Sequence, residues 1–395
     1  MTAQQKQNVI PAIVLGTHTM GLGVIRALGR MNVPVVAVYY DSEKDMGYAS
    51  KYVTRRIHAP HPESSPDDFI ELLINLGTSY AGGVLFPVSD ETLVTVSKNK
   101  TQLSRFYQVA CTEWEITRNF IDKKYTYALA EGVGVGVPKT LYPTCREDVE
   151  DFGHRVEFPC LVKPSQSHLF FAHFGRKMVP VSNQEEMIRY FLQAEEAGLE
   201  VVLQEIIPGD DEQVVNYNSY FRDGLPIAEF TAQHIRKAPP QFGSPCVAIS
   251  RDIPEVIEPG RKILQALNFY GYSCSEYKLD LRDGVYKLME VNGRHNLSTL
   301  LAVRCGINFP WLHYRHLCDE ELPVFSGFTT GVYWIDIARD LGSSTKCLTK
   351  GRNSLRRFLK PYFKPHIFAV LDLFDPKPFL KRLVYLFRKA VHLTR

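Results

Sequence analysis

The apolar positions near the start of the chain predict a parallel α/β sheet. Residues 10–15 form a short apolar run that ends at a glycine, the following residues continue with helical spacing, and a second β-branched run covers residues 33–40. A strand, a glycine turn, a helix and a second strand in this order form the unit from which parallel sheets are built. A helix is expected near 69–76 and another strand at 83–87. We therefore predict an α/β domain with a parallel sheet over residues 1–115.

Beyond residue 115 the pattern changes from alternating strands and helices to strand-rich hairpins. An Asp-Gly turn at 283–284 stands between two alternating apolar runs, and such a turn is a strong hairpin signal. The change predicts an α+β domain over 116–325, followed by a basic extension over 326–395. The expected strands are 160–164, 200–207, 214–221, 227–233, 275–281 and 286–291, and the expected helices are 123–131, 184–197 and 258–267.

Composition places the chain among ordinary globular proteins. It has 395 residues, of which 45% are hydrophobic and 23% charged, and this length predicts two to four domains. The eight cysteines contain no C-x-x-C pair, which favours reduced thiols over a disulfide framework. The first residues lack the layout of a signal peptide, and no run approaches the roughly 18 apolar residues of a membrane span. We expect a cytoplasmic protein.

The predicted hairpin carries the most informative polar residues. Antiparallel pairing can bring Glu276 on its first strand near Glu290 on its second, and Asn292 and Arg294 follow Glu290 at steps of two, on the same face. Two carboxylates and an amide oxygen suit Mg²⁺, which completes its shell with water and phosphate oxygens. Any one of these residues alone would be interpreted as a solvated surface charge. The set on one face predicts a site for Mg²⁺ and a nucleoside triphosphate.

Three other segments carry polar residues of matching chemistry. Lys163 leaves the end of an apolar strand, where phosphates are often held, and Lys123 opens a helix upstream. The segment 204–212 ends a strand whose backbone can pair with an adenine edge, and it continues with acids suited to ribose hydroxyls. Each of these signals is weak by itself, because an exposed lysine or an acidic turn usually just faces water.

In this order the motifs resemble the ATP-grasp superfamily. The order is Asp-Lys, then apolar-Lys-Pro, then Gln-Glu-x-x-Pro-Gly, then Glu followed by Glu-x-Asn-x-Arg. Within the superfamily the chain looks closest to carboxylate–amine ligases of the D-aspartate ligase kind, over about residues 10–320. The resemblance implies a Rossmann-like PreATP-grasp domain and an ATP-grasp core of two α+β subdomains that enclose ATP. The Glu-Val-Asn-Gly-Arg segment at 290–294 is its most distinctive piece.

The resemblance also implies a role for each matching residue, and three departures from the pattern matter. The loop 165–171 lacks the glycine-rich phosphate flap of the superfamily, and His234 stands where many relatives have a lysine. We have no role for His295. The implied roles are phosphate binding by Lys123, Lys163 and, in place of the flap, Lys177; adenine contact by Gln204, Glu205 and Ile207; ribose contact by Glu212; binding of Mg²⁺ or Mn²⁺ by Glu276, Glu290 and Asn292; and catalysis by Arg294 and Arg236.

The activity that the resemblance implies is ATP-dependent formation of a carbon–nitrogen bond. The γ-phosphoryl group passes to a carboxylate, and an amine of the amino-acid type then attacks the acyl phosphate. A non-catalytic ATP-binding protein is one alternative. An NAD-linked oxidoreductase is another, suggested by Gly16, Gly21, Gly23 and the later Asp41, although their spacing departs from the dinucleotide fingerprint. No nucleic-acid-binding module accompanies the basic residues.

The basic excess of the chain lies in its last residues, where twelve Lys/Arg and two Asp fall between 350 and 395. Residues 379–389 have helical apolar spacing with interspersed basic residues. Such a helix can lie on an anionic membrane surface. The alternative, which we weigh slightly higher, is an ordinary helix packed on the catalytic domains with a solvated basic face.

Overall fold

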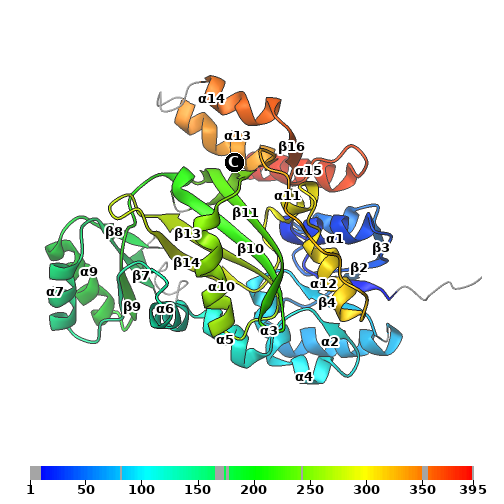
Figure 1. Cartoon of the computed structure of the whole chain (residues 1–395), viewed down its shortest axis with the longest axis horizontal. Helices are drawn as coiled ribbons and strands as arrows, with labels where there is room; N and C mark the ends of the chain where they lie inside the picture. Colours follow the sequence, from blue (N-terminus) through cyan, green and yellow to red (C-terminus); the bar gives the residue numbers. More distant parts are fainter. Residues whose placement is uncertain are drawn as a thin grey trace, which may run out of the picture. The chain divides into compact units, whose positions relative to one another are not determined.

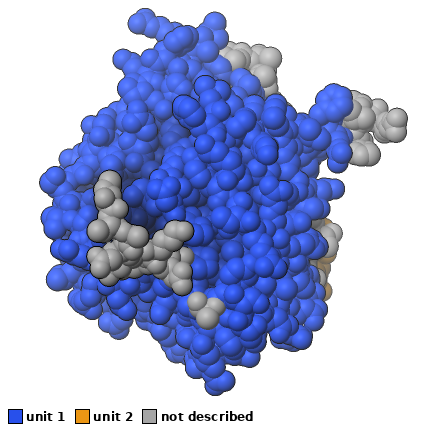
Figure 2. Space-filling view, turned by 90° about the vertical axis from the view of Figure 1, so that its right-hand side faces the viewer, with its two compact units in different colours: residues 1–135, 210–277, 290–395 blue, residues 136–209, 278–289 orange. Residues whose placement is uncertain are grey.

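The computed structural model of the chain divides into two compact units. It describes residues 10–80, 82–164, 173–174, 178–241, 243–348 and 355–393. Unit 1 comprises Met1–Val135, Asp210–Tyr277 and Glu290–Arg395, and unit 2 comprises Gly136–Gly209 and Lys278–Met289 (Figure 2, blue and orange). The domain boundaries near residues 115 and 325 were predicted from the sequence pattern, whereas the two units are defined by how compactly their residues pack. The boundaries therefore stay a prediction.

The first part of unit 1 is the predicted parallel α/β sheet. Its strand order is β3-β2-β1-β4-β5, so the order reverses between β1 and β4. Figure 1 labels β2, β3 and β4 of this sheet. The central strands β1, β2 and β4 are almost wholly buried, which explains their continuous apolar runs. The elements are β1 (Ala12–Leu15), α1 (Thr19–Gly29), β2 (Val35–Tyr39), η1 (Gly47–Ala49), β3 (Val53–His58), α2 (Pro66–Ser79), β4 (Val84–Pro87), α3 (Asp90–Lys98), α4 (Lys100–Leu103), β5 (Gln108–Val109) and α5 (Trp114–Ile121).

The glycines after β1 have a steric reason that requires no dinucleotide. Gly16 has φ +96°, a conformation that side chains rarely adopt. A Cβ atom on Gly21 would lie 2.0 Å from the backbone oxygen of Gly16. Both glycines are therefore needed for α1 to begin close against the end of β1.

The second part of unit 1 is a seven-stranded sheet of order β14-β13-β10-β11-β12-β15-β16. Strand β10 pairs antiparallel with β11, β11 with β12, and β12 with β15. Strand β16 runs parallel to β15. One hydrophobic cluster joins Leu22 of α1, Phe230 of β11 and Trp334 of β15. The elements are α6 (Lys123–Gly132), η2 (Asp211–Gln213), β10 (Val214–Arg222), β11 (Leu225–Ala238), β12 (Ser244–Ser250), η3 (Pro254–Val256), α10 (Ile257–Ala266), β13 (Gly271–Leu279), β14 (Tyr286–Asn292), α11 (Thr299–Arg304), α12 (Phe309–Leu317), β15 (Tyr333–Ile335) and β16 (His366–Phe368).

The C-terminal segment is built into unit 1 rather than appended to it. Its strands β15 and β16 extend the large sheet, and its helices are α13 (Ile337–Leu348), α14 (Leu355–Leu359), η4 (Lys360–Phe363) and α15 (Lys377–Leu393). Asp375, which precedes α15, forms a salt bridge of 3.0 Å with Arg26 of α1, and the two side chains are 1% and 0% exposed. Within the described residues, none of the helices is both long and apolar enough to span a bilayer.

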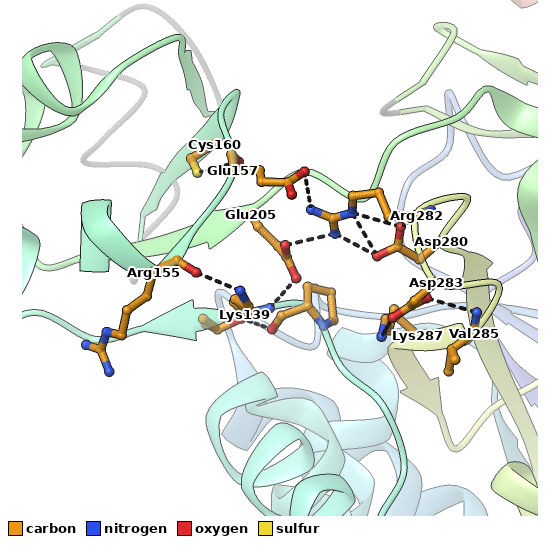
Figure 3. A network of polar contacts seen from close by, with 12 residues as sticks. Lys139, Arg155, Glu157, Cys160, Glu205, Asp280, Arg282, Asp283, Val285 and Lys287 are labelled. Carbon is orange, nitrogen blue, oxygen red and sulfur yellow. Dashed lines mark hydrogen bonds and ion pairs between the residues drawn. The ribbon is translucent and has the colours of Figure 1, made fainter. Parts of the chain in front are cut away.

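Unit 2 contains a four-stranded sheet of order β6-β9-β7-β8, with antiparallel pairing throughout. The tip of the β13–β14 hairpin belongs to this unit. There, Arg282 binds Asp280 at 2.6 Å and Glu205 at 2.9 Å, and Glu205 also accepts the backbone N–H of Lys139 at 2.8 Å (Figure 3). The elements are β6 (Thr140–Leu141), α7 (Arg146–Arg155), β7 (Cys160–Pro164), β8 (Val179–Val181), α9 (Gln184–Glu196) and β9 (Val201–Glu205).

Candidate active site

The base of the β13–β14 hairpin, which belongs to unit 1, brings together acids and cations. Asn292 donates a hydrogen bond of 3.0 Å to Glu290, two residues before it on β14. Lys123, the first residue of α6, lies 3.3 Å from the other oxygen of Glu290. On β13, Glu276 lies 3.3 Å from the Nζ of Lys237. The predicted metal ligands therefore share one site with two lysines, of which the sequence pattern indicated Lys123 only.

The electrostatics of this hairpin base differ between the two acids. Burial raises the pKa of Glu276, and the nearby charge of Glu290 adds to that effect while Lys237 opposes it. Burial also acts on Glu290, but Lys123, the Asn292 hydrogen bond and Arg294 together hold the pKa of its carboxyl below the ordinary value. Each acid thus depends on a neighbouring cation for its ionisation. A divalent cation would supply the same compensation to both.

The donor set fits Mg²⁺. The side chains of Glu276 and Glu290 are 21% and 39% exposed, so solvent and a ligand reach them. Among the residues that the structure describes, no group of three or more His, Cys, Asp and Glu could hold a metal ion. A cation at the hairpin base would therefore need the amide oxygen of Asn292 together with non-protein oxygens. Mg²⁺ has this preference, because it keeps several waters and is completed by phosphate oxygens.

Arg294 extends from the hairpin base to the carboxyl edge of the parallel sheet. Its guanidinium makes two hydrogen bonds to Asp90, of 2.6 and 2.9 Å, and a third of 3.3 Å to the sulfur of Met20. Asp90 begins α3 directly after β4, and Met20 lies in the first turn of α1 after β1. Open α/β sheets bind ligands at the point where strand order reverses, and here that point lies between β1 and β4.

His18 and Glu91 lie at the same edge of the sheet. Burial lowers the pKa of His18, and the charge of Arg294 adds to this effect, whereas Asp45 and Glu91 oppose it. Burial would raise the pKa of Glu91, yet hydrogen bonds from Ser89 and from its own backbone, with the charges of His18 and Arg294, keep it below the ordinary value. Sequence reasoning assigned no role to His18 or Glu91, because single polar residues after a strand carry no distinctive spacing.

Arg236, predicted to be catalytic, is not brought to the hairpin base. Its guanidinium binds both carboxylate oxygens of Asp340 on α13, at 2.7 and 2.9 Å. The pairing of β11 with β12 shifts register on both sides of Arg236, which reverses the alternation of side chains there. The neighbouring Lys237 consequently faces Glu276, and it replaces Arg236 as the candidate cation of this strand.

In unit 2 the predicted nucleotide contacts lie on neighbouring strands. Lys163 on β7 donates a hydrogen bond to the side-chain oxygen of Gln204 on β9, whose amide nitrogen donates in turn to Thr140 at 2.8 Å. Ile207 is only 2% exposed. The carboxylate of Glu205 is engaged by Arg282 and by the Lys139 backbone, so this side chain stabilises the unit (Figure 3).

Two further nucleotide contacts were predicted, from Glu212 and from Lys177. Glu212 lies in η2 of unit 1, where it forms an ion pair with Arg357 of α14. Lys177 and the loop 165–171 lie outside the described residues. The predicted phosphate contact of Lys177 therefore stays an expectation from the sequence.

Three histidines of unit 1 are buried: His234, His295 and His313 are 0%, 3% and 6% exposed. Burial lowers the pKa of His234, and the charge of Lys237 adds to the effect. Burial lowers the pKa of His295 to about 3 and also lowers the pKa of His313. The ring of His295 stacks on Tyr272 with 4.2 Å between ring centroids. These imidazoles are neutral at pH 7 and contribute to packing, which gives His295 a structural role.

Comparison with known proteins bears on the family and the fold of the chain. No family model matches the chain. The chain is 24% identical to the D-aspartate ligase of Enterococcus faecium (strain Aus0004) over 326 residues, which cover 78% of this chain and 76% of that protein. Among solved structures it resembles the biotin carboxylase of Campylobacter jejuni in complex with β-γ-ATP, with a TM-score of 0.66, 14% identity and coverage of 82% and 74%. It also resembles an L-amino acid ligase from Bacillus licheniformis, with a TM-score of 0.59, 16% identity and coverage of 80% and 75%. The resemblance predicted from the sequence motifs is confirmed.

Proposed function

Because the chain has the ATP-grasp fold, with a Rossmann-like domain before the core, we propose that it is a ligase that uses ATP to join a carboxylate to an amine. One observation carries the proposal. Glu276, Glu290 and Asn292 lie together at the hairpin base, and each acid is paired with a lysine. An enzyme that binds a metal–triphosphate complex needs acids for the metal and cations for the phosphates, and this site offers both.

The residues of unit 1 divide into ligands of the metal and ligands of the phosphates. Glu276, Glu290 and Asn292 would hold Mg²⁺ or Mn²⁺, and the bound ion would neutralise phosphate charge. Lys123 and Lys237 would then exchange their present partners for phosphate oxygens. Phosphoryl transfer depends on such positioning and charge compensation more than on a protein nucleophile.

The proposed reaction has two steps. A carboxylate oxygen of the first substrate attacks the γ-phosphorus of ATP, and the bond to the bridging oxygen breaks, which releases ADP and leaves an acyl phosphate. The amine nitrogen of the second substrate then attacks the acyl carbon. Inorganic phosphate leaves, and the nitrogen loses a proton to give the amide. The guanidinium of Arg294 would stabilise the charge that develops on the transferred phosphoryl group or on the tetrahedral carbon.

The residues of unit 2 would bind the nucleotide. Lys163 would contact phosphates, and the segment from Gln204 to Ile207 would face the adenine. For Glu205 this role falls to the backbone, since its carboxylate is engaged by Arg282. Ribose contact by Glu212 would require its ion pair with Arg357 to open. Phosphate contact by Lys177 completes the proposed set.

The carboxylate substrate is proposed to bind at the carboxyl edge of β1 and β4. His18, Glu91 and Arg294 lie there and offer groups of both signs. A substrate that carries both an ammonium and a carboxylate group would match this mixture, so we propose an amino acid or a similar small molecule. We also propose a cytoplasmic location, where ATP and amino acids are available.

The test is release of ADP from Mg-ATP in the presence of pooled amino acids and other carboxylates, with hydroxylamine as a surrogate amine. A hydroxamate formed with one pool would establish the acyl phosphate and identify the carboxylate class. Absence of ATP turnover together with binding of a nicotinamide nucleotide would favour the oxidoreductase alternative. Binding of ATP without turnover in any pool would favour the non-catalytic alternative.

Variants test the residues at the hairpin base. Glu290→Ala combined with Asn292→Ala should abolish Mg-dependent turnover, because two of the three metal ligands are lost. Asp283→Ala serves as the matched control, since Asp283 lies in the turn of the same hairpin and binds Lys287. Circular dichroism checks that each variant is folded. Full activity of the double variant would refute the metal assignment.

A further inference from the structure

The outer face of α15 presents an apolar stripe to solvent. Leu380, Leu383, Val384 and Phe387 recur at steps of three and four, so they lie on one side of the helix. They are 56%, 44%, 53% and 72% exposed. Among the described residues of the whole chain, seventeen large hydrophobic side chains are exposed, and nine of them lie in residues 355–387. Large apolar side chains concentrated in this way mark an interaction surface.

Two more apolar side chains stand directly before the helix. Leu373 and Phe374 are 86% and 81% exposed, although they follow the buried residues Ala369 and Val370. The backbone at this point is well fixed, because Phe374 donates its N–H to Asp372 at 2.9 Å. We name these two residues and the four of the helix stripe the α15 apolar surface.

The charged side chains that the C-terminal segment itself places beside the α15 apolar surface are mostly basic. Within residues 355–389, Asp372 and Asp375 are the only acids, and both bind arginines: Asp372 binds Arg30, directly after α1, at 2.5 Å, and Asp375 binds Arg26 of α1 at 3.0 Å. The exposed ionic side chains of this described segment are all basic. They are Arg356, Arg357, Lys360, Lys364, Lys377, Arg388 and Lys389.

The opposite face of α15 fixes the helix on unit 1. Arg382 forms a salt bridge of 2.9 Å with Asp336, whose side chain is 1% exposed. Lys381 contacts Tyr48 of η1 through its ammonium group, and Phe379 packs against the hydrophobic cluster of the large sheet. The apolar stripe therefore points outward from a helix that is already folded and anchored. Binding through this face would not require the helix to form first.

From these observations we propose that the α15 apolar surface docks the protein on the surface of an anionic phospholipid membrane. The six apolar side chains enter the boundary between headgroups and acyl chains, and the basic residues beside them contact the lipid phosphates. A helix with one apolar face and basic flanks binds in the plane of the interface in this way. An acidic protein partner would match the charges too, but apolar side chains along one face of an anchored helix, with basic residues near both of its ends, match a lipid interface more directly.

The experiment is flotation of the full-length protein with vesicles of phosphatidylcholine alone or with 30% phosphatidylglycerol. We expect the protein to float with the anionic vesicles at low salt and to be released as salt is raised. Lys377→Ala with Arg388→Ala and Lys389→Ala should weaken binding roughly 100-fold, at about fivefold per charge. Leu383→Ser with Phe387→Ser should abolish flotation. Absence of flotation with anionic vesicles at low salt would overturn the proposal.

A matched control distinguishes binding through this surface from nonspecific hydrophobic adsorption. Leu225→Ser with Leu281→Ser removes two side chains that are 63% and 58% exposed outside the C-terminal segment. This control should float like the unchanged protein, and equal loss in both double variants would overturn the assignment to α15. Sedimentation velocity detects self-association. A dimer that Leu383→Ser with Phe387→Ser dissociates, without any flotation of the unchanged protein, would replace the membrane with a second copy of the chain as the partner.

Discussion

Replacement of Asp375 by alanine should destabilise unit 1 by about 3 kcal/mol. Its carboxylate binds the Nε of Arg26 at 3.0 Å, the hydroxyl of Ser50 at 2.7 Å and the backbone N–H of Lys51 at 2.8 Å. Removal of one partner from a buried ion pair costs about 3–5 kcal/mol, because the other charge stays buried without compensation. Asp372 lies 4.0 Å from Arg26 and retains part of the attraction, which places the expectation at the lower end of the range.

Urea unfolding followed by tryptophan fluorescence measures this effect. Asp372→Ala is the matched control, because Arg26 keeps Asp375 in this variant and the lost partner Arg30 is 34% exposed, so a loss of about 0–1 kcal/mol is expected. Arg26→Leu combined with Asp375→Ala should be more stable than Asp375→Ala alone, because the buried guanidinium is then removed together with its partner. A loss in Asp375→Ala no larger than that in Asp372→Ala would refute the reasoning.

Three more predictions follow from the site and the core. Lys237→Met should lower the rate of ADP release roughly 100-fold, as expected for one lost phosphate contact, in a variant that circular dichroism shows to be folded, and unchanged turnover would remove Lys237 from the site. Burial raises the pKa of the Cys274 thiol to about 12, so iodoacetamide at pH 8 should label the half-exposed Cys145 well before Cys274, as judged by mass spectrometry. Burial lowers the pKa of His295 to about 3, so this residue takes up a proton only on unfolding as the pH falls below about 6.5. The free energy of unfolding should then fall by up to ~1.4 kcal/mol per pH unit, and His295→Phe should reduce that slope in urea titrations at pH 7 and 5.

The elements with strong apolar patterns were predictable from the sequence. The runs that became β1, β2, β7 and β10 are largely buried, and burial is the physical cause of the pattern. The edge strand β3 was missed, because the side chains from Thr54 to Arg56 are exposed and two of them are arginines. An edge strand is held by backbone hydrogen bonds and needs no apolar face.

Some residues of the site were also predictable from the sequence, and others were not. The acids of the hairpin were found because an Asp-Gly turn sets the pairing of the two strands locally. Lys237 was missed because its orientation depends on two register shifts in β11, which the alternation of residues does not reveal. The partner of Arg236 lies 104 residues further along the chain, so no local signal distinguished an arginine that binds Asp340 from one that contacts phosphate.

The distance along the chain between Arg26 and Asp375 also affects how the protein is made. The two residues are separated by 349 positions. At a synthesis rate of roughly 5–20 residues per second, the guanidinium of Arg26 waits on the order of 20–70 s for its carboxylate. Strands β15 and β16, at the edge of the large sheet, are also among the last parts to emerge from the ribosome. The first domain is thus completed only near the end of translation, and nascent chains stalled before residue 375 would be the forms most exposed to chaperones and proteases.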